Sequence, residues 1–427
     1  MVLKSNNDNK ERWHVPGLNR QVIIFLIYSL IFHIGLFGIT DSLLNFYFLS
    51  VGYEAETIGT LQALPRLSGF LTGLPIGIFA NRFGKRQIII FSTYGIAIST
   101  VAVVLVQGLP LLMMSRFLFG FFFGAGQVVK PPYMVTLTHS DEHTAQFSYH
   151  NFISMSAVAM GSVLGGFMPL IISRIFSIHS IQALPAEQTS DAYRGAILLA
   201  ALLILLSVIP LYRLPKDILN QKTPKKQNGK SSSDNVPWLR IIKLSIPLLI
   251  FGISGGLTFP FFNLFFRETF DIPDNIVGII LALGWLGMAI IPLLNPIWEK
   301  HVGRAKALTG LMSISAIAFF GLGVVPTLLF AVILYIFAIA IRNTMQPLYQ
   351  PLLMDSLPSN LHNLASSVGL VLWNLGWFAS TMSFGILQGQ IGYSGIMILV
   401  AIFVLLNGLS IFVAFKRSSG FGSVAKN

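Results

Sequence analysis

Long apolar stretches alternate with short polar breaks along the whole chain. The first covers residues 21–48, after a polar start. Stretches of similar length follow near 57–80, 87–107, 110–136, 146–173, 193–212, 239–265, 275–298, 305–325, 327–354, 361–388 and 391–415. Because about 20 apolar residues cross a bilayer as a helix, the pattern predicts twelve transmembrane helices joined mostly by short loops.

The composition supports the same fold class. Of the 427 residues, 54% are hydrophobic and 10% are charged, and the mean hydropathy is +0.73. Soluble domains carry about 25% charged residues. A soluble enzyme and a disordered chain are therefore excluded, and we predict an all-α polytopic membrane protein. The chain has no cysteine, which excludes disulfides, iron–sulfur clusters and thiolate zinc sites.

The net charge of +12 would suggest a nucleic-acid partner in a soluble protein. Here the basic residues follow the membrane topology. With the N-terminus inside, the inner segments hold most of the loop Lys and Arg, and the outer segments hold Arg174, Arg194 and Arg267. Lysine and arginine accumulate in cytoplasmic loops. We therefore expect a multi-pass protein of the plasma or inner membrane with both termini cytoplasmic and no nucleic-acid partner.

The longest polar break divides six predicted helices from six. It contains the run KTPKKQNGKSSSDN, which cannot build a core. We interpret it as a flexible linker, with a specific regulatory loop as the alternative. The expected organisation is an N-terminal cytoplasmic tail at 1–20, a six-helix bundle at 21–212, a cytoplasmic linker at 213–238, a second six-helix bundle at 239–415 and a cytoplasmic tail at 416–427.

The two halves are weakly similar to each other. The segment 77–86 at the end of helix 2 matches the segment 296–304 at the end of helix 8, at a shift of 219 residues. The run KPPY at 130–133 matches QPLY at 346–349, at a shift of 216. Two nearly equal shifts at corresponding places indicate a duplicated six-helix unit, which is one recognised plan of transporters.

These segments resemble motifs of the major facilitator superfamily. The match to its loop 2–3 motif involves Gly77, Arg82, Gly84, Lys85 and Arg86, with Asn81 in place of the usual aspartate. Helix 4 adds Arg116, Gly120 and Gly124, which resemble the helix 4 motif of the family. Helix 5 adds Gly161, Gly165 and Gly166, which resemble the glycine-rich helix 5 motif of efflux members without its proline. The resemblance implies two pseudo-symmetric six-helix bundles, alternating access, and a conformational latch at loop 2–3. The alternative for this loop is a basic anchor at the cytoplasmic headgroups.

Few charged residues lie deep inside the predicted helices. With a rise of about 1.5 Å per residue, Asp41, Arg66 and Arg116 share a layer roughly 9–14 Å below the outer boundary. A charge in the membrane is costly and usually faces an interior cavity. Asp41 is the deep carboxylate, so we interpret it as the proton-coupling group, in contact with one of the arginines. The alternative is a static ion pair that holds the helices together.

Other polar and aromatic residues could line a substrate cavity. Arg342 is expected near mid-bilayer, and Lys130 either points into the cavity or extends to the inner headgroups. His33, two turns from Asp41, is either a packed polar group or part of a proton relay. The predicted cavity residues are Lys130, Arg342, Gln346, Tyr349, Trp373, Asn374 and Trp377.

These features indicate a secondary active transporter rather than an enzyme. No nucleotide-binding motif or metal-ligand spacing is visible, so no cofactor is expected. The preferred interpretation is proton-coupled efflux of a small organic or amphipathic solute. The alternatives are transport of an organic anion or anionic lipid headgroup, and a membrane scaffold or sensor that does not transport. The expected partners are a small-molecule substrate, the lipid bilayer, and a proton or other coupling ion, with the protein acting as a monomer.

Overall fold

The computed structural model describes residues 18–137, 143–175, 186–215, 237–358 and 361–415, and within these ranges it leaves out the side chains at 70, 73–82, 144–145, 186–189 and 363. The predicted C-terminal tail, residues 1–17 of the predicted N-terminal tail and most of the predicted linker lie outside the described residues. The described part is helical, as the apolar stretches predict.

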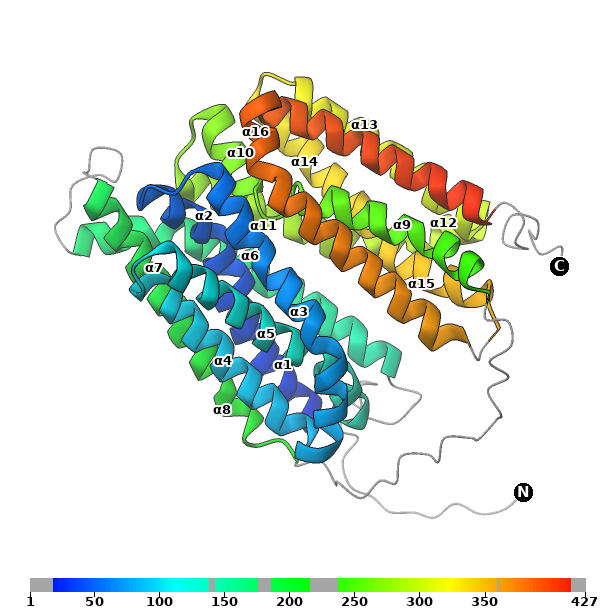
Figure 1. Ribbon diagram of the computed structural model, residues 1–427, viewed down its shortest axis with the longest axis horizontal. Helices are drawn as coiled ribbons and strands as arrows, with labels where there is room; N and C mark the ends of the chain where they lie inside the picture. The colour runs from blue at the N-terminus through cyan, green and yellow to red at the C-terminus, as the bar shows by residue number, and fades with distance from the viewer. Residues whose placement is uncertain (1–17, 138–142, 176–185, 216–236, 359–360, 416–427) are drawn as a thin grey trace, which may run out of the picture.

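The first six crossings lie side by side in one bundle (Figure 1). They are formed by α1 (Arg20–His33), the π-helical segment η1 (Ile34–Thr40), α2 (Asp41–Ser50), α3 (Ala55–Phe83), α4 (Lys85–Leu105), α5 (Leu109–Met134), the 3₁₀ turn η2 (Val135–Leu137), α6 (His143–Ile175), α7 (Ala186–Leu206) and α8 (Val208–Leu211).

The remaining crossings form a second bundle beside the first, with α3 and α16 next to each other where the bundles meet (Figure 1). They are formed by α9 (Trp238–Gly256), α10 (Phe262–Phe270), α11 (Asp274–Ile290), the 3₁₀ turn η5 (Ile291–Leu294), α12 (Asn295–Val302), α13 (Arg304–Val324), α14 (Leu328–Asn343), α15 (Met345–Asp355) and α16 (His362–Phe415).

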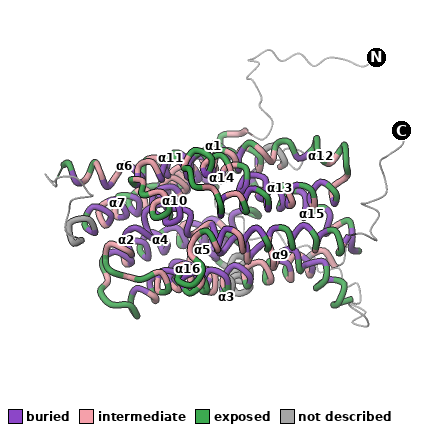
Figure 2. Tube along the Cα trace, turned by 90° about the horizontal axis from the view of Figure 1, so that it is seen from above, coloured by how far each residue is buried: buried purple, intermediate pink, exposed green. Residues whose placement is uncertain are grey.

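The number of crossings agrees with the hydropathy pattern. Ten helical stretches among the described residues are long and apolar enough to cross a membrane. One of them, Leu364–Phe415, bends at Gly392, where φ is 65°, and therefore makes two crossings. With α3, the chain has about twelve, and the prediction of an all-α polytopic fold is confirmed. Exposed residues alternate with buried ones along the helices (Figure 2).

Two turn glycines show the internal repeat in the backbone. Gly84 has φ 86° and ψ 140° and precedes α4, and Gly303 has φ 81° and ψ 153° and precedes α13. Glycine adopts positive φ without the strain that a Cβ causes. The two positions differ by the 219 residues found in the sequence comparison. These turns, the last residue of α8 and the first residue of α9 mark one end of the molecule, which we call the linker end. We call the opposite end the far end.

Several crossings are interrupted by irregular backbone. The first contains η1, and the seventh is broken between α9 and α10, just around Pro260. Irregular backbone at membrane depth is tolerated where protein groups satisfy its polar atoms, and π-helical segments are frequent at functional sites. Both interruptions lie next to the polar residues described below.

The two bundles touch through small residues in the far half. A Cβ on Gly166 of α6 would lie 2.7 Å from the Asp274 carbonyl oxygen of α11, and a Cβ on Gly278 would lie 3.0 Å from Gly166 Cα. On the other side, a Cβ on Gly59 of α3 would lie 3.0 Å from the Thr381 carbonyl oxygen of α16. Small residues let membrane helices approach closely. These contacts hold the far halves of the bundles together.

Candidate functional site

Asp41, Arg66 and Arg116 lie in one layer of the first bundle. Asp41 begins α2 directly after η1, and its charge interacts with both arginines. Among the described residues, no ion pair joins the Asp41 carboxylate to either guanidinium. Asp41 is exposed, whereas Arg116 is buried. An accessible carboxylate near two bases, deep in a spanning segment, is a group whose charge can change.

Arg116 is held against α3 by the geometry of Pro65. Proline has no N–H, so the carbonyl four residues earlier, at Leu61, loses its helical donor. Arg116 Nε donates to that carbonyl at 2.9 Å, and its Nη2 donates to Gln62 Oε1 at 2.6 Å. The approach of α5 to α3 depends on Gly124, where a Cβ would lie 2.7 Å from Gly69 Cα. The helix 4 motif thus holds the Arg116 side chain of α5 against α3.

Arg116 begins a chain of hydrogen bonds that reaches the second bundle. Gln62 Nε2 donates to Asn45 Oδ1 at 2.6 Å, and Asn45 Nδ2 donates to Asn263 Oδ1 at 3.0 Å and to the Pro260 carbonyl at 2.5 Å. Asn263 Nδ2 donates to the carbonyl of Ser42, next to Asp41, at 3.0 Å. We call Arg116, Gln62, Asn45 and Asn263 the amide network.

The sequence analysis did not identify the amide network. Asn45, Gln62 and Asn263 are single polar residues within apolar stretches, and Asn45 and Asn263 are 218 residues apart. The available signal was the helix-breaking run from Gly255 to Pro260, because a broken crossing exposes carbonyls that side chains must satisfy.

Arg66 bridges the two bundles through aromatic rings. Its guanidinium carbon lies 4.2 Å from the ring centre of Trp377 and 5.6 Å from that of Trp373, both on α16. The Trp373 Nε1 is buried and makes no hydrogen bond within the described part of the chain. An indole N–H in this position can donate to a ligand. The structure therefore brings Asp41, Arg66 and the two tryptophans into one region.

Lys130 points into the bundle and not to the headgroups at the linker end. Helical side chains lean toward the N-terminus of their own helix, which for α5 is the far end. The Lys130 ammonium accordingly lies 3.9 Å from the ring centre of Phe32 and 5.3 Å from that of Tyr28. Of the two orientations left open by the sequence, the structure shows the inward one.

Arg342 is buried in the second bundle, with 2% of its surface exposed. Its Nε donates to Ser254 Oγ at 3.1 Å and its Nη2 donates to the Phe251 carbonyl, while the guanidinium stacks on the Phe251 ring. No described carboxylate forms an ion pair with it. In this conformation the protein itself occupies two of its nitrogens.

The other predicted cavity residues differ in their positions. Tyr349 is fully buried and donates its hydroxyl to the Leu244 carbonyl, so its ring packs inside the bundle and does not face a cavity. Gln346 is exposed, and Asn374 is partly exposed with its amide donating to the Leu370 carbonyl at 2.9 Å. Of Tyr349, Gln346 and Asn374, only Tyr349 is placed by the structure away from the predicted substrate cavity.

The loop 2–3 motif is described in part. Gly77, Asn81 and Arg82 lie in the segment of α3 without described side chains, and Lys85 begins α4. Arg86 is buried and donates Nε to the Leu211 carbonyl and Nη2 to the Tyr212 carbonyl, both at 2.9 Å. Arg86 therefore binds the carboxyl end of α8 within its own bundle, where a cation is favourable.

A buried polar cluster joins the bundles at the far end. Tyr193 of α7 donates its hydroxyl to Asp274 Oδ2 of α11 at 2.5 Å. Arg267 of α10 lies 3.5 Å from the other Asp274 oxygen and donates to the Tyr193 hydroxyl at 3.2 Å. We call Tyr193, Arg267 and Asp274 the far-end cluster. The sequence analysis assigned Arg267 and Asp274 to loops and gave no sign that Tyr193 would meet them.

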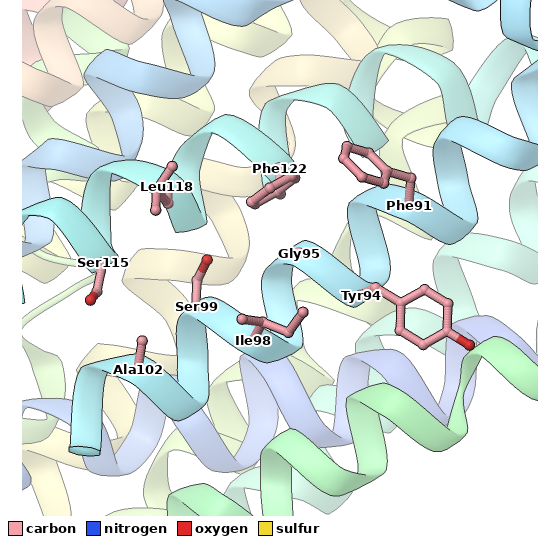
Figure 3. A pocket seen from close by; sticks show the side chains of 9 residues that line it. All are labelled: Phe91, Tyr94, Gly95, Ile98, Ser99, Ala102, Ser115, Leu118 and Phe122. Carbon is pink, nitrogen blue, oxygen red and sulfur yellow. The ribbon is translucent and has the colours of Figure 1, made fainter. Parts of the chain in front are cut away.

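A separate hollow of about 310 Å³ lies between α4 and α5 (Figure 3). Its lining includes Phe91, Ile98 and Leu118, which are exposed, and its surface is almost entirely apolar. An apolar, outward-facing hollow on a membrane protein suits hydrocarbon chains and contains none of the predicted site residues.

Comparison with known proteins agrees with this architecture. The sequence pattern of the Major Facilitator Superfamily matches residues 24–381. A bacterial homologue of the human lysosomal transporter Spinster, solved in an inward-facing and occupied conformation, superposes with a TM-score of 0.73 at 14% identity over 95% of this chain and 98% of that one. A D-xylose–proton symporter superposes with a TM-score of 0.70 at 15% identity over 92% and 96%.

A sequence relative shares a shorter segment. The probable chloroplastic anion transporter 4 of Oryza sativa subsp. japonica is 32% identical over 126 residues, which are 29% of this chain and 21% of the rice protein. The match thus spans about a fifth of that relative. The pattern match over most of the chain, together with the helical architecture, establishes the family: the chain belongs to the Major Facilitator Superfamily and is a multi-pass secondary transporter, not an enzyme.

Proposed function

We propose that this protein is a proton-coupled transporter of a small organic solute that works by alternating access, with Asp41 as the proton acceptor. The observation that carries the proposal is the position of Asp41. It is an accessible carboxylate within a spanning segment, its charge interacts with Arg66 and Arg116, and no ion pair fixes it among the described residues. Such a carboxylate can bind and release a proton at low structural cost.

The proposed coupling runs from Asp41 to the contacts between the bundles. An ionised Asp41 attracts Arg116, and Arg116 donates to Gln62 at the start of the amide network. Protonation removes that attraction and changes the balance of forces on Arg116. Asn263 of α10 donates to the Ser42 carbonyl, next to Asp41. Protonation of Asp41 therefore also acts on the second bundle. A ligand shifts a conformational equilibrium only through such a difference between the two states.

The conformation in which the far end is open requires new contacts at the linker end. The close approaches at Gly59 and Gly166 hold the far half shut, so opening the far side must break them. We propose that the loop 2–3 segment with Gly77, Asn81 and Arg82 then closes the linker side as a latch, and that the linker end is cytoplasmic. For direction, the resemblance of the helix 5 glycines to the motif of efflux members supports export.

Export of an amphipathic solute and transport of an organic anion are two candidates for the substrate. Arg66, Arg116, Lys130 and Arg342 are four membrane-embedded bases, against Asp41 as the deep acid. An embedded base without an acid is stabilised by an anion. The partial match to a rice protein named as a probable anion transporter is consistent with the second candidate.

The test is transport by the purified protein in liposomes. Two probes separate the substrate candidates: ethidium, an amphipathic cation, and benzoate, an organic anion. With an imposed pH gradient, the wild type should accumulate one of them against its own gradient. Failure to move either probe would favour the alternative of a membrane scaffold or sensor.

The Asp41→Asn variant tests the coupling. It should lose accumulation against a gradient while keeping part of the exchange of labelled for unlabelled probe, since an amide cannot carry the proton. Asp191→Asn is the matched control, because Asp191 is an exposed residue that pairs with Arg194 at 2.8 Å outside the site. Accumulation by Asp41→Asn at the wild-type rate would show that Asp41 is not the proton acceptor.

A further inference from the structure

A second polar cluster lies within the first bundle, on the linker side of the charged layer. The Ser29 hydroxyl lies 3.1 Å from His33 Nδ1, 3.0 Å from His150 Nε2 and 3.1 Å from Ser154 Oγ. His33 Nδ1 also donates to the Ser29 carbonyl at 2.6 Å. His33 and Ser29 belong to α1, and His150 and Ser154 belong to α6. The two imidazole rings are 6.1 Å apart, so one hydroxyl holds two basic rings together in a spanning region.

Lys130 of α5 adds a third basic group to this cluster. Its charge acts on both His33 and His150, and its ammonium lies over the ring of Phe32, the residue before His33. No hydrogen bond to Lys130 exists within the described part of the chain. The charged groups that act on the two imidazoles are Lys130 and, for His33, the other imidazole, and no described carboxylate contributes.

The groups around the cluster are aromatic, not acidic. His33 stacks on Phe37 with 5.5 Å between ring centres, and Phe25 lies 5.8 Å from His150. Both histidines keep part of their surface accessible, while Ser29 is buried. A buried ammonium without a hydrogen bond, a neighbouring imidazole and an aromatic surround without a described carboxylate form an environment that an anion would stabilise.

We propose that Lys130 and His150 form the subsite that binds the negatively charged group of a small organic anion, with His33 packed beside them. The ammonium supplies the charge, and when Ser29 donates to His150 Nε2 the His150 ring carries its N–H on Nδ1, which is left to donate to the anion. His33 has its Nδ1–H bound to the Ser29 carbonyl and contributes ring surface together with Phe37. This inference rests on the proposed transport of organic anions and places its binding in the first bundle. Arg342, by contrast, already donates to Phe251 and Ser254.

The test measures binding alone, so it does not depend on Asp41 coupling. The melting temperature of the full-length protein in detergent is followed against rising benzoate, with benzamide as the neutral analogue of the same shape. Benzoate, and not benzamide, should stabilise the wild type. Lys130→Met should raise the benzoate concentration for half-maximal stabilisation about tenfold or more, since a charge-assisted contact is lost.

The ligand-free melting temperature separates binding from a structural role. A methionine at 130 packs on the same rings and removes an unpaired embedded charge, so Lys130→Met without ligand should melt at or above the wild-type temperature. His150→Gln, which can still bond Ser29, should also weaken benzoate binding. Lys243→Met is the matched control, because Lys243 is exposed and lies at the linker end of α9.

Three results would overturn the inference. The first is equal stabilisation by benzoate and benzamide. The second is a benzoate response that survives Lys130→Met and disappears in Arg342→Gln, which would move the site to the second bundle. The third is stabilisation through Lys130 by dioleoylphosphatidylglycerol and not by benzoate, which would identify a lipid headgroup. None of these results would alter the test of Asp41, which is read from transport.

Discussion

The far-end cluster offers a direct measure of what holds the bundles together. Tyr193→Phe removes the hydroxyl that donates to Asp274 at 2.5 Å and accepts from Arg267 at 3.2 Å, and it keeps the buried ring. A hydrogen bond to a charged group contributes about 1.5–3 kcal/mol. Asp274 retains Arg267 at 3.5 Å, so the lower end of that range applies. The conformation with a closed far end should therefore become about tenfold less populated relative to the conformation with an open far end.

The magnitude is large enough to observe. If the far-open state holds about 1% of the wild-type population, it should rise to about 10% in the variant. The chain has no cysteine, so spin labels can be attached at Glu54→Cys and Gln390→Cys without removing native thiols. Both positions are exposed, and they flank the contact in which Gly385 meets the backbone of Glu56. Pulsed electron resonance then gives the distance distribution across the far end.

The matched control is Tyr335→Phe. Tyr335 is buried in the second bundle, and its hydroxyl makes no hydrogen bond within the described part of the chain. Its loss should leave the distance distribution unchanged. A Tyr193→Phe distribution that matches both the wild type and Tyr335→Phe would show that the hydroxyl does not stabilise the closed far end.

Two further substitutions test the packing and the amide network. A valine at Gly120 would place its Cβ against the backbone of Pro65, so Gly120→Val should lower the melting temperature. The overpacking should cost about 1–3 kcal/mol of the free energy of unfolding. The control is Gly310→Ala, which has no atom within 4 Å of the new Cβ and should not destabilise the protein. Asn263→Leu removes the partner of Asn45 and should slow probe transport in liposomes more than it changes probe binding; wild-type transport by this variant would show that the network is not part of the cycle.

The sequence by itself determined the helical plan and the depth of the charges. Twelve apolar stretches predict twelve crossings because a bilayer has a fixed thickness, and the repeated turn glycines at Gly84 and Gly303 reflect a backbone that other residues adopt only with strain. A fixed rise per residue was enough to place Asp41, Arg66 and Arg116 in one layer. These properties depend on local geometry and on the membrane, and both can be read along a single chain.

The tertiary structure alone decided which groups meet. Asn45 and Asn263 are 218 residues apart and Tyr193 and Asp274 are 81 apart, and such pairs depend on how helices rotate and dock. The same is true of the side of a helix that a residue faces: Tyr349 shares a helical pattern with cavity residues and is fully buried. Depth follows from counting residues, but rotation and docking follow from the packing of small residues such as Gly124 and Gly166 against backbones that the sequence does not identify.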